Sequence, residues 1–324
     1  MLKKFLRAAA RPLLARTQVL LTGHLQDVRE RQQELALLLG RMHAARVTAL
    51  PDRTALRQAE FKVFSQWGED GIIQYLLSKV EVRKRFFIEF GVENYRESNT
   101  RFLIQQDNWS GLVIDGSEAH VSLIRSEALY WRYDLTAAAA FVTAENINDL
   151  IRPYVNDPDI GLLSIDIDGN DYWVWKTIDV VTPRIVICEY NSLFGCERAV
   201  TVPYRSDFLR TRAHHSNLFW GASLPALCML AEQKGYAFAG SNSAGNNAFF
   251  VRRDLTERIL TLSAQKGYVE SRFRESRDAS GALTYVSGDE RLRLIEDMEL
   301  WDVVANRLVP VGEAFADRFH RLEG

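Results

Sequence analysis

Short apolar runs along the middle of the chain predict buried strands that alternate with helices. Four of these runs are almost continuously apolar, and they span Phe86–Val92, Gly111–Asp115, Gly161–Asp168 and Arg184–Tyr190. A weaker strand is expected at Phe141–Thr143. Strands that are apolar on both faces and are separated by helix-length segments are typical of a parallel sheet covered by helices on both sides.

The pattern changes at the end of this region. Two strand candidates, Tyr236–Ser241 and Asn247–Arg253, are joined by a short turn that contains Gly245. A parallel crossover needs about a dozen residues, so these two strands must pair as an antiparallel hairpin. We therefore expect an α/β, Rossmann-like fold whose mostly parallel sheet finishes in an antiparallel hairpin. Residues after Thr256 are charged and predict a helical tail.

The N-terminal segment, residues 1–55, predicts a helical extension ahead of a domain over residues 56–324. Pro12 should kink or restart its first helix. Residues Val28–Val47 predict an amphipathic helix, and Ala49–Arg53 predict a linker. Two interpretations stay open: an anchor on a membrane surface, or a helix that packs on the domain or pairs with a second subunit. The apolar positions of the amphipathic helix are Leu35, Leu38, Leu39 and Met42.

Composition and charge narrow the class of protein. Hydrophobic residues make up 47% of the 324 residues, enough for a large core, and the net charge of −2 argues against a nucleic-acid partner. Three scattered cysteines suit a reducing compartment. The chain lacks a run of about 18 apolar residues. We therefore expect a cytoplasmic protein whose contact with the inner membrane would be peripheral, through the N-terminal helix.

Acidic and polar residues gather at the ends of the predicted strands. In open α/β sheets, ligands bind beyond the carboxyl ends of the strands, where the strand order reverses. A carboxylate after the second strand is the usual partner of two ribose hydroxyls, and Asp115 stands there. The alternative is that Asp115, Gly116 and Ser117 simply begin the next helix. The residues at the four strand ends are Glu89 and Gly91, Asp115, Asp166 and Asp168, and Glu189 and Asn191.

The loop after the first strand argues against a dinucleotide. Gly91 is followed by Val92 and Glu93, so the loop lacks the further glycines that cradle a pyrophosphate. A nucleoside without phosphate suits this acidic rim better. S-adenosylmethionine fits, because its sulfonium and amino groups are cationic and would be attracted by Glu89 and Glu93.

Six segments, taken in order, resemble bacterial class I S-adenosylmethionine-dependent methyltransferases, most closely the FkbM-like group and its relatives linked to glycan modification. The resemblance covers about Phe61–Leu255 and implies a seven-stranded sheet whose last two strands form the hairpin. The segments are FSQWGEDGIIQYLL from Phe64, FFIEFGVE from Phe86, Asn99-Thr100, SGLVIDGSE from Ser110, FVTAENIN from Phe141 and LLSIDIDGNDYWVW from Leu162.

The resemblance also implies a set of cofactor contacts. Glu145 or Asn146 would lie near the adenine, and Gln66 and Glu69 would close over the cofactor unless they simply begin a capped helix. The expected contacts are Gln66, Glu69, Glu89, Gly91, Asn99, Thr100, Asp115, Gly116, Glu145, Asn146 and Asp166.

Methyl transfer to a hydroxyl needs an aligned acceptor oxygen that loses its proton, and three routes are open. In the first, a divalent cation such as Mg²⁺ or Mn²⁺ lowers the pKa of the hydroxyl. In the second, Asp168 or Glu189 acts alone as the base. In the third, His215 is the base, unless this histidine belongs to a surface loop. The expected metal ligands are Asp166, Asp168, Glu189 and Asn191, and the expected catalytic residues are Asp168, Asp166, Glu189 and His215.

Taken together, these features predict an S-adenosylmethionine-dependent O-methyltransferase that acts on a sugar or glycan hydroxyl, with a small-molecule or glycan acceptor and a homo-oligomer formed through the N-terminal helix. Two other classes stay open. One is a metal-dependent, sugar-modifying or hydroxylase-like relative on the same sheet. The other is a catalytically silent module that acts in assembly.

Overall fold

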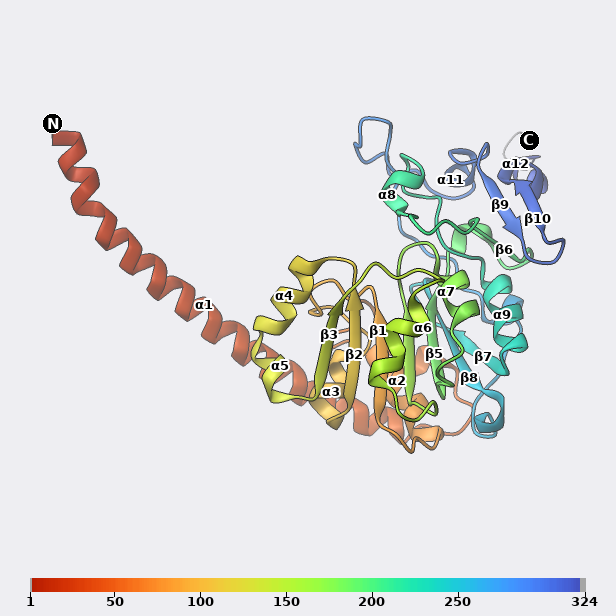
Figure 1. Cartoon of the computed structure of the whole chain (residues 1–324), viewed down its shortest axis with the longest axis horizontal. Helices are drawn as coiled ribbons and strands as arrows, with labels where there is room; N and C mark the ends of the chain where they lie inside the picture. Colours follow the sequence, from red (N-terminus) through yellow and green to blue (C-terminus); the bar gives the residue numbers. More distant parts are fainter. Residues whose placement is uncertain (1, 321–324) are drawn as a thin grey trace.

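The protein is built on one seven-stranded sheet (Figure 1). The computed structural model describes residues 2–320, and for residues 2–22, 25, 26 and 320 it describes the backbone alone. The strand order is β3-β2-β1-β4-β5-β8-β7. The strands are β1 Phe86–Phe90, β2 Ser110–Asp115, β3 Leu135–Ala139, β4 Leu162–Ile165, β5 Ile185–Glu189, β7 Tyr236–Ser241 and β8 Asn247–Arg252.

Strands β1 to β5 run parallel, whereas β8 is antiparallel to both of its neighbours, β5 and β7. The predicted mostly parallel sheet with a terminal hairpin is therefore confirmed. In the register, Ile88 of β1 lies between Leu112 of β2 and Leu163 of β4. The chain turns outward in opposite directions from β1 and β4, so their carboxyl ends form the switch point where a ligand site is expected.

The predicted weak strand at Phe141–Thr143 is wrong by a few residues. Strand β3 is Leu135–Ala139, and Phe141–Thr143 lies in the loop after it. Alanines fill most of β3, so its apolar signal is weak, yet Leu135 and Ala137 are buried against the core. The Asn146 side chain then fixes the loop, accepting from the Thr143 N–H at 2.9 Å and donating to the Phe141 carbonyl at 2.9 Å.

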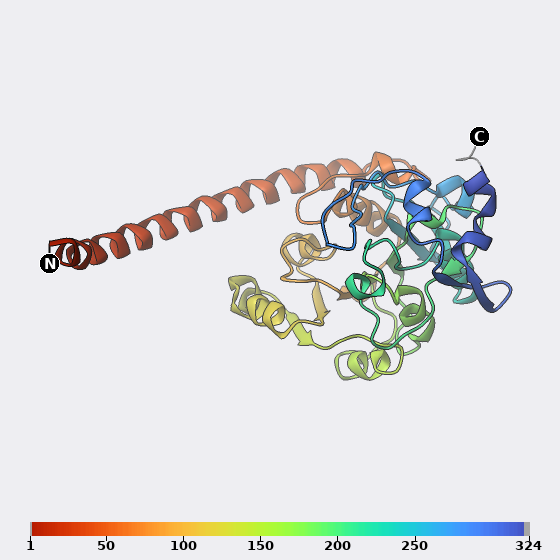
Figure 2. The same cartoon turned by 90° about the horizontal axis from the view of Figure 1, so that it is seen from above.

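Helices cover both faces of the sheet, and each face has its own apolar core. One core packs β-strand residues such as Ile88 and Leu112 against α6, α7 and α9, and the other packs Phe87 and Val113 against α2, α3 and α4. Figure 2 shows α1 and α2 along one side of the sheet and α6 on the other. These helices are α1 Leu2–Thr48, α2 Glu69–Lys79, α3 Arg101–Asp107, α4 Glu118–Ser126, α5 Ala128–Arg132, α6 Ile147–Ile151, α7 Asp171–Thr177 and α9 Leu224–Gln233.

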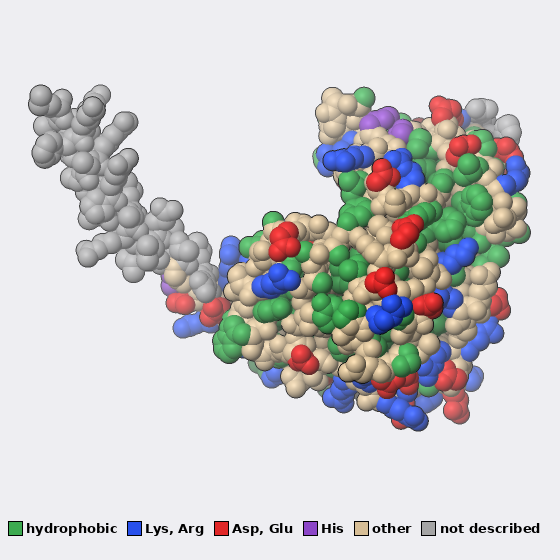
Figure 3. All heavy atoms as spheres, in the orientation of Figure 1, with side chains coloured by type: hydrophobic (Ala, Val, Ile, Leu, Met, Phe, Trp, Pro, Cys, Tyr) green, Lys and Arg blue, Asp and Glu red, His purple; other side chains and the backbone are tan. Residues whose placement is uncertain are grey.

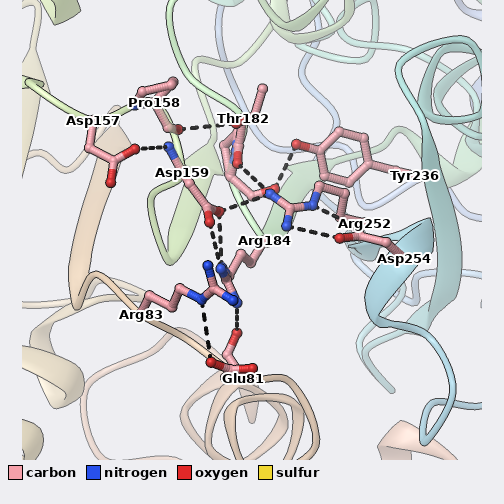
Figure 4. A network of polar contacts seen from close by, with 11 residues as sticks. Glu81, Arg83, Asp157, Pro158, Asp159, Thr182, Arg184, Tyr236, Arg252 and Asp254 are labelled. Carbon is pink, nitrogen blue, oxygen red and sulfur yellow. Dashed lines mark hydrogen bonds and ion pairs between the residues drawn. The ribbon is translucent and has the colours of Figure 1, made fainter.

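A network of charged residues binds the β7–β8 hairpin to β5 at the end of the sheet opposite the carboxyl ends of the parallel strands (Figure 4). Arg184, whose side chain is 4% exposed, donates from Nε to Asp159 at 2.9 Å. Arg252 of β8 binds Asp159 at 2.8 Å and Asp254 at 2.8 Å. Tyr236 of β7 donates to the Pro183 carbonyl at 2.6 Å. This network ties β5, β8 and β7 together and leaves their other ends free to shape a site.

A small lobe sits above the carboxyl ends of the strands. It contains a second antiparallel sheet of three strands and an apolar cluster that includes Leu193, Phe208 and Leu300. The predicted helical tail is wrong here, because Leu300 and Val309 alternate inward on a hairpin whose turn is held by the Asp302 side chain. The elements of the lobe are η3 Ser192–Phe194, β6 Val200–Thr201, α8 Arg210–Ala213, α11 Glu290–Arg293, β9 Glu299–Asp302, β10 Arg307–Pro310, α12 Val311–Ala314 and α13 Ala316–His320. Helix α10, Ala264–Gly267, packs instead on α9 and β7 of the main sheet domain.

Helix α1 runs without a break from Leu2 to Thr48 and projects from the domain (Figure 1), so the interruption expected at Pro12 is absent from the described backbone. Only its last turns dock. Ala44 and Val47 are buried, and Arg41 Nε binds Gln106 Oε1 at 2.7 Å. The predicted linker Ala49–Arg53 is also tied down, since Asp52 pairs with Lys79 and Arg258.

The predicted amphipathic face of α1 points away from the domain. Leu35, Leu38, Leu39 and Met42 are between 54% and 65% exposed. Within the described part of the chain, no helix combines the length and apolar character needed to cross a membrane. The basic residues before Gln18 have side chains outside the described ones, so the membrane and second-subunit interpretations both stay predictions.

We expect Val47→Ala to lower the free energy of unfolding by about 1–3 kcal/mol, because Val47 is fully buried. The matched control is Val28→Ala on the same helix, where the side chain is 40% exposed and the change should stay within about 0.5 kcal/mol. Chemical denaturation measures both values. Equal effects would contradict the docking of α1 through its last turns.

Candidate functional site

A cleft of about 600 Å³ opens at the carboxyl ends of β1, β2, β4 and β5, and we call it the main cleft. Figure 3 shows the molecular surface hollowed between the body and the small lobe at this place. Its size is typical of a small-molecule site. Nine of the residues predicted from the sequence line it: Gln66, Glu89, Gly91, Asn99, Asp115, Gly116, Asp166, Asp168 and Glu189.

Gly91 lets two strand ends approach each other at the floor of the main cleft. Its φ is +71°, and a Cβ added here would lie 1.6 Å from the carbonyl oxygen of Asp166. The Gly91 N–H donates to the Ile114 carbonyl at 2.9 Å. No side chain fits in that contact, so this position requires glycine for steric reasons. The close approach brings Asp166 to the floor of the cleft.

Glu89 holds the neighbouring loop in place. It is 4% exposed and accepts from the Ser98 hydroxyl at 2.6 Å, the Asn99 N–H at 2.8 Å and the Thr100 N–H at 3.2 Å. Burial raises the pKa of the Glu89 carboxyl, and these hydrogen bonds oppose that rise. Glu89 therefore positions Asn99 at the wall of the cleft.

Asp115 is both a helix-start residue and a wall of the main cleft, so the two sequence interpretations are not exclusive. One carboxylate oxygen accepts from the Glu93 N–H at 2.7 Å, and the other accepts from the Ser117 N–H at 2.8 Å. Ser117 then caps α4 by accepting from the His120 N–H. The His120 ring nitrogen Nδ1 also lies 3.1 Å from the oxygen that binds Ser117. A carboxylate has about four acceptor positions, so Asp115 keeps about one of them for a ligand hydroxyl.

Asp166 and Glu189 form an acid pair at the floor of the cleft, where their carboxyl groups are in hydrogen-bonding contact. Burial, followed by the negative charges nearby, raises the pKa of both groups well above the ordinary carboxyl range. Two adjacent carboxylates rarely ionise together, so the acid pair favours sharing one proton over losing both.

Arg210 of the small lobe reaches down to the strand ends. Its guanidinium binds Asp168 at 2.7 Å and Glu275 at 3.3 Å, and Nε donates to the Asn217 carbonyl at 2.9 Å. It also lies over the Trp220 ring, 4.7 Å from the centroid. Asp168, with φ +55° and an exposed side chain, is therefore neutralised by an arginine and is a weak candidate for a free base.

Three buried oxygen atoms around the main cleft have no hydrogen-bond partner in the protein. They belong to Asn170, Glu189 and Asn247, and all three residues line the cleft. The Asn170 amide is held by its donation to the Arg205 carbonyl, and the Asn247 amide by its donation to Glu69. A buried acceptor without a donor is costly. The cleft therefore suits a ligand that brings several O–H or N–H groups.

Some predicted residues lie outside the main cleft. Glu69 is fully buried, where it accepts from the Trp67 and Gly68 N–H groups and from the Asn242 and Asn247 amides, so it fixes the hairpin turn. Thr100 is also fully buried and bonds Glu89.

The remaining misplaced residues are surface or capping groups. Glu145 accepts a hydrogen bond from Tyr204, and Asn146 fixes its own loop. His215 is exposed and stacks near His214, with ring centroids 4.1 Å apart, and it does not line the main cleft. The part of the β3 loop that lines the main cleft is Ala140, Phe141 and Val142.

The predicted metal set does not fit a metal ion. The Asn191 side chain accepts from the Leu193 N–H at 3.0 Å and donates to the Leu218 and Trp220 carbonyls, so it caps η3 instead of facing the cleft. The Asp168 carboxylate is already paired with the Arg210 guanidinium. Among the described residues, no group of three histidine, cysteine, aspartate or glutamate side chains is arranged to hold a metal ion.

Sequence reasoning missed the contribution of the small lobe to the main cleft. The signal for Asn170 was present in the DGND segment, but the others lie far along the chain and share no motif. The lining residues missed outside the sheet domain are Phe208, Leu209, Arg210, Thr211, Asn217 and Glu275, and two missed residues of the sheet domain are Asn170 and Asn247.

Comparison with known proteins gives one family match. The model of the family described as methyltransferase FkbM domain matches residues 58–219, half of the chain. The comparison with curated proteins gave no match.

Two solved structures illustrate the similarity to known folds. The N-terminal domain of EvdMO1 with SAH bound is 12% identical, with a TM-score of 0.34 over 51% of this chain and 72% of that one. A SAM-dependent methyltransferase from Aquifex aeolicus is 8% identical, with a TM-score of 0.33 over 56% of this chain and 89% of that one. Similarity at these scores carries no argument about substrate or mechanism.

We expect Glu189→Gln to stabilise the protein above neutral pH. The folded acid pair has a raised pKa, so its contribution to the free energy of unfolding is largest at low pH and falls as the pH rises from the unfolded pKa toward the folded one. The amide removes that loss, for a gain of about 1–2 kcal/mol at pH 8 and little change near pH 4.

The matched control for this prediction is Glu93→Gln, an exposed residue of the same cleft, which should give no pH-dependent difference. Chemical denaturation across the pH range measures both variants. A Glu189→Gln profile parallel to that of the wild type would contradict the shared proton.

Proposed function

Because the chain belongs to the FkbM methyltransferase family, of class I and dependent on S-adenosylmethionine, we propose that it transfers a methyl group to a hydroxyl oxygen of a polyhydroxylated acceptor such as a sugar or glycan. One observation carries this proposal: the acid pair lies beside buried acceptor atoms that lack donors. An acceptor rich in hydroxyl groups would supply those donors and would place one hydroxyl against the pair.

The residues of the main cleft fit the cofactor. Asp115 keeps an acceptor position for a ribose hydroxyl, and the wall of Ala140, Phe141 and Val142 offers an apolar surface to the adenine. Acidic groups around the floor favour a cationic ligand. When bound, S-adenosylmethionine supplies a methyl group on a positively charged sulfur.

The acid pair would remove the acceptor proton. Burial and the neighbouring negative charges raise the pKa of both carboxyls, which makes the pair a stronger base than an ordinary carboxylate. The buried, unpartnered oxygen of Glu189 is the atom that would receive the hydroxyl hydrogen. Asn170 and Asn247 would hold further hydroxyl groups, and Arg210 keeps Asp168 neutralised beside them. This route assigns proton removal to carboxyl groups, and no metal is part of the proposal.

We expect Asp115→Ala to weaken S-adenosylhomocysteine binding by about 1–3 kcal/mol, since a ribose hydroxyl would lose its acceptor. Calorimetry on the full chain measures the affinity. The matched control is Glu145→Gln, which lies outside the main cleft and should leave the affinity unchanged. A wild-type protein that binds no S-adenosylhomocysteine at millimolar concentration would favour the silent assembly module instead.

We expect Glu189→Gln and Asp166→Asn each to slow methyl transfer by about 100- to 10,000-fold while leaving cofactor affinity within about twofold. Transfer of labelled methyl groups to a panel of free and phosphorylated sugars measures the rate, and a one-methyl mass gain identifies the acceptor. Wild-type activity should rise with pH as the acid pair loses its shared proton.

Two outcomes would contradict this assignment of the base. One is an equal loss of rate and of cofactor affinity, which would place the acid pair in the cofactor site. The other is activity that disappears on chelation and returns with Mg²⁺ or Mn²⁺, which would favour the metal-dependent alternatives.

A further inference from the structure

A second cavity, of about 280 Å³, lies in the small lobe behind the end of β5, and we call it the arginine cavity. Its lining includes three arginines, Arg272, Arg274 and Arg291, and a single acid, Glu270. None of the three arginines forms an ion pair with a residue that the structure describes, in contrast to Arg210 and Arg318 nearby. The three arginines outnumber the single acid Glu270, so the lining carries a net positive charge.

Arg291 is the central group of the cavity. Its Nε is buried and has no hydrogen-bond partner. Burial and then repulsion from Arg210 lower the pKa of Arg291. The surroundings therefore disfavour the charged form of its guanidinium. A buried donor without an acceptor costs free energy that an oxyanion would recover.

The arginine cavity adjoins the main cleft through residues 270–275, which we call the strap. Residues of the strap line the cavity, whereas its last residue, Glu275, lines the main cleft and pairs with Arg210. Phe273 of the strap stacks on Trp67, with ring centroids 5.1 Å apart, beside the cleft residue Gln66. Ser192, the first residue of η3, anchors the strap by a hydrogen bond to Ser271 at 2.7 Å.

We propose that the arginine cavity binds a phosphate group carried by the acceptor. The inference rests on the proposed function, because it makes the acceptor of the main cleft a phosphorylated sugar. Guanidinium groups bind phosphate oxygens in pairs, and three arginines against one acid suit a group with two negative charges better than a carboxylate. A phosphate seated here would leave the attached sugar to extend past the strap toward the acid pair.

Calorimetry of inorganic pyrophosphate with the full chain tests the cavity without any methyl transfer. We expect binding that Arg291→Gln weakens about tenfold or more, and that Arg272→Ser with Arg274→Ser also weakens. The matched control is Arg277→Gln, which removes one charge from the segment after the strap but is already paired with Glu275. It should change the affinity by less than about twofold.

Two results would overturn the cavity as a phosphate site. The first is no pyrophosphate binding at 10 mM, a concentration far above that of about 1 mM at which weak sites fill. The second is an equal weakening by Arg291→Gln and Arg277→Gln, which would mean a diffuse charge effect. The exposed positions of Arg272 and Arg274 keep the test valid if Arg291→Gln fails to fold.

A second arm identifies the source of the phosphate. In the presence of S-adenosylhomocysteine, at least one member of a panel of sugar 1-phosphates should bind more tightly than inorganic phosphate. Equal or weaker binding by every member would overturn the acceptor assignment and leave free phosphate as the ligand. Loss of S-adenosylhomocysteine binding itself would count against the proposed function, and the pyrophosphate result is independent of it.

Discussion

The site depends on the cost of burying carboxylates where parallel strands end. A buried carboxylate is tolerated when donors surround it, and Glu89, Glu69 and Asp115 each have several donors from nearby loops. The acid pair lacks this complement, and Glu189 keeps one oxygen without any partner. The difference between satisfied and unsatisfied acids separates the groups that build the fold from those available for chemistry.

The main cleft also needs a second structural unit. The sheet supplies its floor, and the small lobe supplies Phe208, Arg210 and Asn217 on the opposite side. The seven-stranded sheet places its half of the cleft at the switch point, where open α/β sheets bind ligands. The opposite wall therefore comes from segments outside the sheet, and the arginine cavity lies in the same lobe.

Much of the sheet was predictable, because strands that are apolar on both faces have a strong local signal, and the short turn at Gly245 permits only a hairpin. The cleft-lining acids were predictable for a similar reason, since they stand directly at strand ends. Their partners were not. Glu69 is fixed by Asn242, which is 173 residues away, and no local sequence pattern predicts such a contact. The β9–β10 hairpin was missed because tertiary packing, and not periodicity, decides the structure of the segment after Thr256.

Arg210 is held at once by the strand end through Asp168 and by the strap through Glu275. If the strap moved outward, it would carry Glu275 away and leave the guanidinium to Asp168 alone. Entry to the cleft is therefore coupled to the local electrostatic potential, because the Arg210 side chain contacts both the strap and the strand end. An outward movement of Glu275 would leave the rim of the cleft more positive, which would favour the entry of an anionic ligand.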